Sequence, residues 1–196
     1  MYQALLADDT FHQLLLRCDH DLAAAARAER CARCGGRLDA APFARKPRGR
    51  LVVCEAAHDR RFSFCCAVDG CRKRVTPASL RFLGRKIYLG VVVVLATAMQ
   101  HGLTQTRLRR LREAVGVSRR TVARWRLWWL ASFTATPFWR ARSAELMPPI
   151  DTRRLPASLL ERFAGDARAQ LVGILRFLAV RGLDPRITGG AAMQAF

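Results

Sequence analysis

The stretch CCAVDGCRKRVTP, residues 65–77, carries three cysteines and then three consecutive basic residues. Upstream, the stretch CARCGG, residues 31–36, carries a second pair of cysteines separated by two residues and followed by glycine. Two thiolates at this spacing can grip one ion while the backbone turns beneath it, and the glycine accepts the positive φ of that turn. The two stretches predict a closed tetrahedral site for one structural zinc ion, with four ligands: Cys31, Cys34, Cys66 and Cys71.

The choice within the adjacent pair of cysteines rests on strand alternation, which places Cys65 and Cys66 on opposite faces. We select Cys66 because a four-residue loop before Cys71 is more ordinary than a five-residue loop. Cys54 and His58 are alternative ligands that the sequence leaves open.

Residues 29–80, which contain all four ligands, include several glycines and prolines that exclude a long helix. The segments RLVV, residues 50–53, and RRFSFCC, residues 60–66, predict short strands. A segment of this size lacks a large core of its own, and a bound ion would supply the missing folding free energy. We therefore expect a small β zinc ribbon.

The chain of 196 residues has a formal net charge of +19, whereas roughly 2–8 charges suffice for the solubility of a small domain. An excess this large favours a polyanionic partner, most often nucleic acid. Residues 104–126 carry eight arginines and a single acidic residue, Glu113. This concentration of arginines in one segment indicates a surface that binds the polyanion, rather than an arginine bias spread evenly along the chain.

The same region fits a helix-turn-helix in LRRLREAVGVSRRTVARWRLWW, residues 108–129. Gly116 allows the sharp reversal between the two helices, and Ser118 is a favourable N-cap for the second. The apolar positions that this motif requires around the glycine are all filled, by Leu111, Val115, Val117, Val122 and Trp125.

The start of the second helix in this motif lies in the major groove of duplex DNA. There an arginine can contact guanine bidentately or bind a phosphate. The predicted DNA-contacting residues of this helix are Ser118, Arg119, Arg120, Thr121, Ala123 and Arg124. Those of the preceding helix, which would lie along the DNA backbone, are Arg107, Arg109, Arg110 and Arg112.

Helical periodicity predicts six helices, over residues 10–28, 85–100, 104–115, 118–133, 156–164 and 166–180. Thr10 is the expected cap of the first helix, and residues 136–138 and 147–150 are expected connectors. The apolar run at 87–99 is shorter than the roughly 20 residues of a membrane span, so we expect a buried helix and no membrane partner. A stripe of aromatic side chains in the helix over residues 118–133 is expected in the core: Trp125, Trp128, Trp129 and Phe133.

The expected fold is mostly α with a small β zinc ribbon, a three-helix helix-turn-helix core and C-terminal helices. Its parts are an N-terminal helical segment (1–28), the zinc ribbon (29–80), the helix-turn-helix domain (81–135), a C-terminal helical extension (136–180) and a loose tail (181–196).

Two further surfaces are predicted. A basic strip would give the ribbon its own phosphate-binding surface, formed by residues 45–50 with Arg60, Arg61, Arg72, Lys73 and Arg74. Apolar side chains of the C-terminal helices could either close the core or form a homodimer, namely Leu159, Leu160, Phe163, Leu171, Ile174, Leu175 and Leu178.

The order of these motifs resembles the N-terminal DNA-binding region of zinc-ribbon insertion-sequence transposases of the DDE type. The segments CRKRVTPASLRFLGRKIYLG, GVSRRTVARWRLWW and ATPFWRARSAELMPP also resemble bacterial transposase-like proteins that carry only this region. The resemblance covers about residues 29–150 and implies DNA binding in a mobile-element setting. The catalytic domain of those transposases, with three carboxylates holding metal ions, has no counterpart here.

These observations predict a sequence-specific double-stranded DNA-binding protein, either an accessory protein or regulator linked to a mobile element or a transcription factor, and not an enzyme. The alternatives are an RNA- or protein-binding zinc-ribbon adaptor and a reduced transposase or nuclease. The acidic N-terminus lacks the layout of a signal peptide, so we expect a reducing, cytoplasmic, nucleoid-associated setting in which paired cysteines bind metal.

Overall fold

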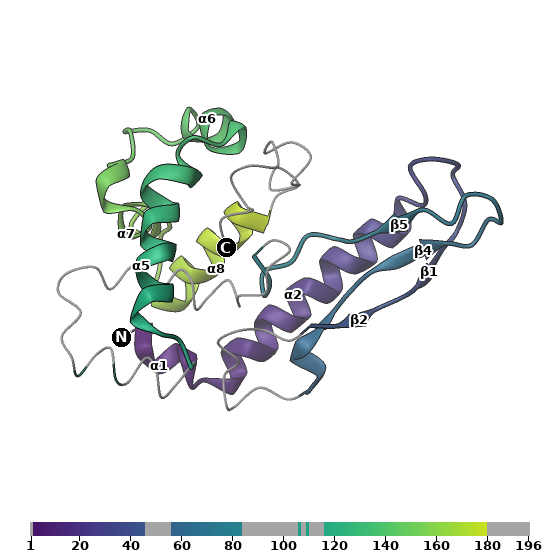
Figure 1. Ribbon diagram of the computed structural model, residues 1–196, viewed down its shortest axis with the longest axis horizontal. Coiled ribbons are helices and arrows are strands. Elements are labelled where there is room, and N and C mark those ends of the chain that lie inside the picture. Colours follow the sequence, from purple (N-terminus) through teal and green to yellow (C-terminus); the bar gives the residue numbers. More distant parts are fainter. Residues whose placement is uncertain (1, 46–55, 84–105, 107–108, 110–115, 180–196) are drawn as a thin grey trace.

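The computed structural model describes residues 2–45, 56–83, 106, 109 and 116–179, and it is mostly helical with a small antiparallel β-structure, as the sequence predicts. Figure 1 shows an elongated arm of strands beside one long helix, α2, with a helical body at the opposite end of that helix. We refer to residues 30–45 and 56–83 as the β arm and to residues 116–179 as the helical body.

Helix α1 spans Tyr2–Leu6, and helix α2 spans Asp9–Ala28. The cap of α2 is Asp8, whose side chain accepts a hydrogen bond from the backbone N–H of Thr10. The prediction of Thr10 as the cap was therefore wrong by two positions. Asp8 and Thr10 are both good capping residues, but the Thr10 hydroxyl instead donates to the Asp8 carboxylate over 2.7 Å.

The β arm contains β1 (Leu38–Ala40), β2 (Phe43–Ala44), the short 3-10 helix η1 (Ala56–Asp59), β3 (Arg60–Arg61), β4 (Phe64–Cys66) and β5 (Arg74–Val75). All pairings are antiparallel, with the order β1-β4-β5 in one sheet and β2-β3 in the other. The strands predicted from RRFSFCC are confirmed as β3 and β4, whereas the segment at 50–53 lies outside the described residues.

Two apolar cores lie along α2. The larger one packs Phe11 and Leu15, near the start of α2, against side chains of the helical body. The smaller one joins Ala23, near the end of α2, to Leu38 and Phe64 of the β arm. Helix α2 is therefore shared by both parts of the molecule and fixes the arm to the body.

A buried ion pair reinforces this junction. Asp19 of α2 and Arg81 at the end of the β arm have side chains that are 0% and 2% exposed, and Arg81 Nε lies 2.8 Å from the Asp19 carboxylate. The carboxylate also accepts from the backbone N–H of Leu80 and from the Ser79 hydroxyl. The other guanidinium nitrogens of Arg81 donate to the carbonyls of His58 and Arg60 at 2.8 and 3.0 Å. Both buried charges are thus compensated, as their removal from water requires.

The helical body begins with α5 (Arg119–Leu127), which continues into a π-helical turn, η2 (Trp128–Phe133). The wider turn keeps the chain helical while the rings of Trp128, Trp129 and Phe133 are all buried, with centroids 4.8–5.2 Å apart. The expected helix from Ser118 to Phe133 and its buried aromatic stripe are confirmed.

Helix α6 (Pro137–Ser143) forms where a connector was predicted. Thr136 accepts a hydrogen bond from the backbone N–H of Trp139, and proline occupies the first turn, where its missing N–H costs nothing. The Thr-Pro pair is therefore a helix start rather than a break. The remaining elements are η3 (Thr152–Arg154), α7 (Ala157–Leu160) and α8 (Ala167–Ala179).

The apolar side chains of α7 and α8 lie inside the core of the single chain. Leu171, Ile174 and Leu175 are at most 1% exposed, and Arg168 of α8 donates to the carbonyl of Thr10 at 3.0 Å. Of the two roles that the sequence left open for these residues, core closure is the one that the structure shows.

No helix among the described residues is long and apolar enough to cross a membrane. The predicted helices at 85–100 and 104–115 lie almost wholly outside the described residues, as does the tail at 181–196. Within them only residues 106 and 109 are described, and both are helical and exposed.

Replacement Arg81→Met leaves the Asp19 carboxylate buried without its counter-charge. We expect it to lower the free energy of unfolding by about 3–5 kcal/mol in urea denaturation, the usual effect of breaking a buried ion pair. The double variant Asp19→Asn/Arg81→Met removes the orphaned charge but keeps an acceptor for Leu80, so it should be more stable than Arg81→Met alone. A single variant as stable as the parent would contradict the role of this junction.

Candidate metal centre and basic helix

The first cysteine pair lies in a tight turn directly after α2. Arg30 follows the C-cap residue Glu29 and has a positive φ of 59°, a left-handed conformation that is common just after the end of a helix. The backbone N–H of Gly35 then donates to the carbonyl of Cys31 at 2.7 Å, and the N–H of Cys31 donates to the carbonyl of Gly36 at 3.0 Å. Gly35 has a φ of +70°, as the motif predicts. The turn holds Cys31 and Cys34 on one side of the chain.

Gly36 is required for a different reason. A Cβ atom at this position would lie 2.5 Å from a methyl group of Val68 and 3.0 Å from the sulfur of Cys66. Only glycine lets the first turn approach the second closely enough to bring their sulfurs together. The glycine doublet in CARCGG therefore supplies both a turn conformation and a close approach.

The second pair is held by an equivalent turn. Cys66 ends β4, and its backbone N–H donates to the carbonyl of Lys73 at 2.9 Å. Gly70 has a φ of +81°, and Arg72 has a φ of 41° while its N–H donates to the carbonyl of Val68 at 3.2 Å. This turn presents Cys66 and Cys71 towards the first pair.

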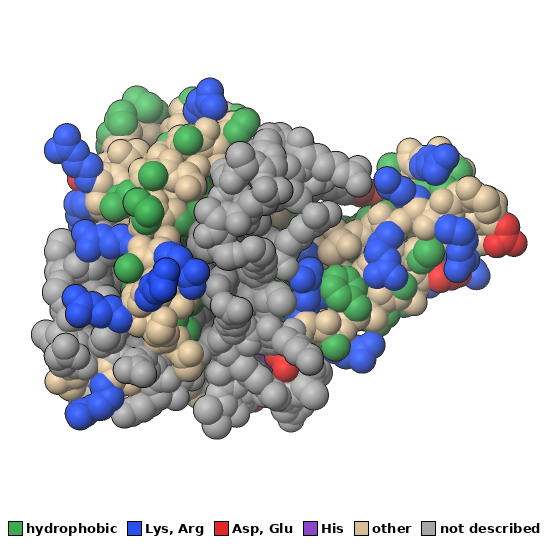
Figure 2. All heavy atoms as spheres, viewed as in Figure 1, with side chains coloured by type: hydrophobic (Ala, Val, Ile, Leu, Met, Phe, Trp, Pro, Cys, Tyr) green, Lys and Arg blue, Asp and Glu red, His purple; other side chains and the backbone are tan. Residues whose placement is uncertain are grey.

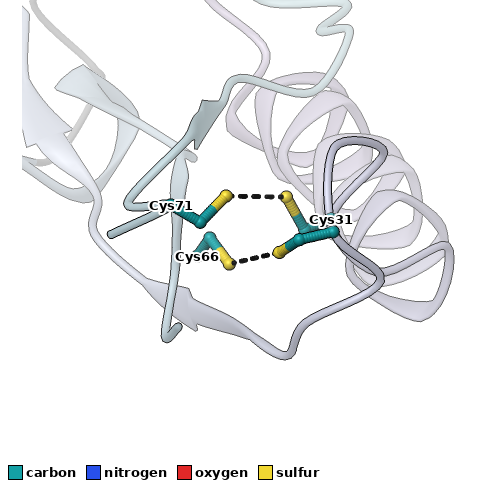
Figure 3. Close-up of side chains that lie close together, drawn as sticks. Cys31, Cys66 and Cys71 are labelled. Carbon is teal, nitrogen blue, oxygen red and sulfur yellow. Dashed lines mark hydrogen bonds between the residues drawn. The ribbon is translucent and has the colours of Figure 1, made fainter. Parts of the chain in front are cut away.

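Four sulfur atoms meet between the two turns, as the close-up in Figure 3 illustrates for the labelled residues. The sulfurs of Cys31 and Cys71 are 3.7 Å apart, those of Cys34 and Cys66 are 3.4 Å apart, and all four lie within 4.8 Å of one another. Sulfurs bound tetrahedrally to one zinc ion at about 2.3 Å lie about 3.8 Å from each other. The four cysteines could therefore hold one metal ion with little rearrangement.

The other candidate ligands are not part of this cluster. The Cys65 sulfur turns away and donates to the carbonyl of Arg72 at 3.5 Å. His58 is buried at the base of the arm, where its ring lies edge-on to that of His12 with centroids 6.4 Å apart. Cys54 lies outside the described residues. Within the described part of the chain, the ligand set is that of Cys31, Cys34, Cys66 and Cys71.

The thiols of this cluster differ in acidity. Backbone N–H groups, foremost that of Arg33, donate to Cys31 and lower the pKa of its thiol to about 7. The backbone N–H of Val68 favours the Cys66 thiolate, but burial and the neighbouring sulfurs outweigh it and raise the pKa of Cys66 to about 12. Four thiolates this close repel one another, and a divalent cation supplies the charge that lets all four ionise. The donor set therefore fits a soft metal ion.

Three of the basic residues predicted for DNA contact lie on α5, namely Arg119, Arg120 and Arg124. Ser118 caps this helix, because its side chain accepts a hydrogen bond from the backbone N–H of Thr121. Val122 and Trp125 are buried towards the body, whereas the opposite face is exposed and carries Arg119, Arg120, Ala123 and Arg124. The predicted division of this helix into a buried and an exposed face is confirmed.

The residues expected along the preceding helix are less completely described. Arg109 is exposed, and Arg107, Arg110 and Arg112 lie outside the described residues. Gly116 has a φ of +62°, a left-handed conformation that glycine adopts at little cost. Val117 follows it and is 3% exposed. The turn before α5 thus has the glycine conformation and the buried valine that the motif predicts.

The basic strip of the β arm divides into two sets. Arg60, Arg72, Lys73 and Arg74 are exposed, as expected, and Arg45 is half-buried, whereas residues 46–50 lie outside the described residues. Arg61 is buried, so its prediction as a surface residue was wrong. Its guanidinium donates to the carbonyls of Pro77 and Ala78, and burial lowers the pKa of Arg61 to about 10. These two carbonyls accept hydrogen bonds from the buried guanidinium and so offset the loss of its contacts with water. The sequence does not reveal them as partners.

Comparison of the chain with protein-family models, curated protein sequences and solved structures finds no match.

Replacement Cys34→Ser removes one of the four thiols. We expect it to reduce metal affinity by more than the roughly 10–100-fold that loss of an outer hydrogen-bond partner costs, because a ligand is lost outright. Titration with Co²⁺, followed by thiolate-to-cobalt charge-transfer absorption, measures this directly. Cys65→Ser is the matched control and should bind like the parent. Equal loss in both variants, or no metal binding by the parent, would contradict the assigned ligand set.

Proposed function

We propose that this chain is a sequence-specific double-stranded DNA-binding protein with one structural zinc ion and a helix-turn-helix centred on Gly116. The observation that carries the proposal is the exposed arginine face of α5. Arg119, Arg120 and Arg124 lie outward on a helix whose opposite face, with Val122 and Trp125, is fixed in the core.

The composition of this helix supports a polyanionic partner. From Arg119 to Phe133 the sequence carries four arginines and no acidic residue. A capped helix with an arginine-rich first turn and a small Ala123 between the arginines fits the major groove, where arginine reads guanine and alanine can contact the methyl group of thymine.

The zinc ion has a structural role in this proposal. Four thiolates complete a tetrahedral shell and leave no coordination position for a substrate or an activated water. The ion would instead hold together a β arm whose own apolar core is small. This assignment makes the arm a zinc ribbon, attached to the DNA-binding helix through α2.

The proposal extends to the setting of the protein. An accessory protein or regulator linked to a mobile element, or a free-standing transcription factor, would use the same surface without catalysis. Binding as a homodimer to two half-sites is the usual arrangement for helix-turn-helix proteins, and sedimentation of the complex with DNA would determine it.

A salt titration separates DNA binding from other uses of a basic surface. If several phosphates are neutralised, the logarithm of the affinity for a duplex falls with the logarithm of salt concentration, with a slope of about −0.9 for each phosphate. Sequences selected from a random duplex pool should then bind roughly 10³-fold or more tightly than unselected duplex. Preference for single-stranded or double-stranded RNA would favour the adaptor function, and metal-dependent cleavage of the duplex would favour a nuclease.

Replacement of Arg120 or Arg124 by alanine tests the recognition helix. If these side chains contact guanine, each replacement should weaken binding to the selected site by roughly 1–3 kcal/mol and relax specificity at one position. Arg153→Ala, at an exposed position in η3, is the matched control and should leave binding unchanged. If binding weakens equally on all duplexes, these arginines contact phosphates rather than guanine. If binding to the selected site does not weaken, α5 is not part of the interface.

A further inference from the structure

The β arm carries a second group of exposed basic residues that the recognition helix does not use. Described residues of the arm include ten Lys and Arg but only three Asp and Glu. One of the three acidic residues, Asp39, already pairs with Arg37 at 3.1 Å. Four of the basic residues, which we term the arm patch, gather around β5 and the end of β2: the exposed Arg72, Lys73 and Arg74, and the half-buried Arg45.

The arm patch is organised around one aromatic ring. The guanidinium of Arg45 lies 4.8 Å from the centroid of the Phe43 ring, and that of Arg74 lies 5.9 Å from it. Cation–π contact with the same ring holds two like charges close together, although they repel each other. The exposed guanidinium of Arg74, held in this way, presents N–H donors at a fixed position, an arrangement that suits phosphate oxygens, and the charge of Arg45 beside it adds to the local positive potential.

Helix α2 sets the separation between α5 and the Arg72–Lys73 end of the arm patch, because Cys71, which precedes Arg72, lies against Cys31 with sulfurs 3.7 Å apart. Arg45 lies nearer the body, since its backbone N–H donates to the carbonyl of Asp59 at 2.7 Å. The start of α2 packs in the same core as Val122 and Trp125 of α5, whereas its end leads directly into the turn of Cys31. Its 20 residues correspond to about 30 Å at 1.5 Å per residue. This length is close to one turn of B-DNA, about 34 Å. The buried pair of Asp19 and Arg81 ties the arm to this helix.

The two basic regions also share an orientation. Figure 2 shows Lys and Arg side chains over α5 and along the β arm on the same face of the molecule. A straight polyanion laid along this face would contact both regions. A duplex has the required charge, length and stiffness, because its persistence length far exceeds the span of the molecule.

From these observations we infer that the arm patch binds the phosphate backbone of the same duplex about one helical turn from the groove occupied by α5. The inference rests on the proposed DNA binding by α5 and adds to it a second contact without base recognition. The arm then contributes affinity and fixes the orientation of the protein, while α5 contributes the sequence preference.

The test uses the full chain and a 40-base-pair duplex carrying the site that the parent protein selects from a random pool. Hydroxyl-radical footprinting of the parent should show backbone protection about 10 base pairs to one side of the α5 site. The charge-removing variant Lys73→Gln/Arg74→Gln should lose that protection, and its salt slope should become shallower by about 1.8, or 0.9 for each phosphate. Its preference for the selected site over unselected duplex should be unchanged.

Two further variants control the measurement. Lys73→Arg keeps the charge and leaves the stacked Arg74 in place, so it should retain the parent footprint. Arg140→Gln/Arg153→Gln removes two exposed charges from α6 and η3 and should not alter the protection. Metal content of each variant shows that the arm is folded.

The outcomes are distinct. A parent footprint confined to the α5 site, or an unchanged salt slope in Lys73→Gln/Arg74→Gln, overturns this inference but leaves the proposed function intact. A parent protein that binds no duplex at low salt overturns both. The footprint of the parent decides the question even if the glutamine variant fails to fold.

Discussion

Convergence of four cysteine sulfurs is the constraint on which the β arm depends. Among the described residues, the apolar core between the arm and α2 has five buried members, and two of them, Cys31 and Cys66, belong to the cluster. Strands of two or three residues contribute few hydrogen bonds, and strand pairs this short are marginal by themselves in water. Closing both turns on one ion would therefore stabilise the arm more than its hydrophobic contacts do.

That local constraint is transmitted along α2 to the rest of the molecule. The helix begins in the core that supports α5 and ends at the first pair of thiols, with the Asp19–Arg81 pair between them. A buried ion pair is weak evidence for added stability, but it fixes one relative position of the parts it joins. The structure thus places the thiolate cluster and the arginine face of α5 at opposite ends of a single rigid element.

Much of this arrangement could be predicted from the sequence where one residue type has one physical role. The two turns could be predicted from cysteine pairs at metal-binding spacing with adjacent glycines, which tolerate a positive φ. The start of α5 could be predicted from a serine that precedes a basic helix. Features that depend on distant partners were missed. Burial of Arg61 requires the carbonyls of Pro77 and Ala78, and the pairing of Asp19 with Arg81 joins residues far apart in the chain. The start of α6 was missed although Thr136-Pro137 carries a recognisable signal, because proline was read only as a breaker.

The central claim is that the exposed face of α5 is where this protein meets DNA. Backbone amide chemical shifts, measured by nuclear magnetic resonance as a duplex of selected sequence is added, test it most directly. The account predicts that the largest changes fall between Ser118 and Arg124, with smaller ones at Arg72–Arg74 and none in the buried face of α8. Shifts that leave α5 untouched while the duplex is bound elsewhere would contradict it.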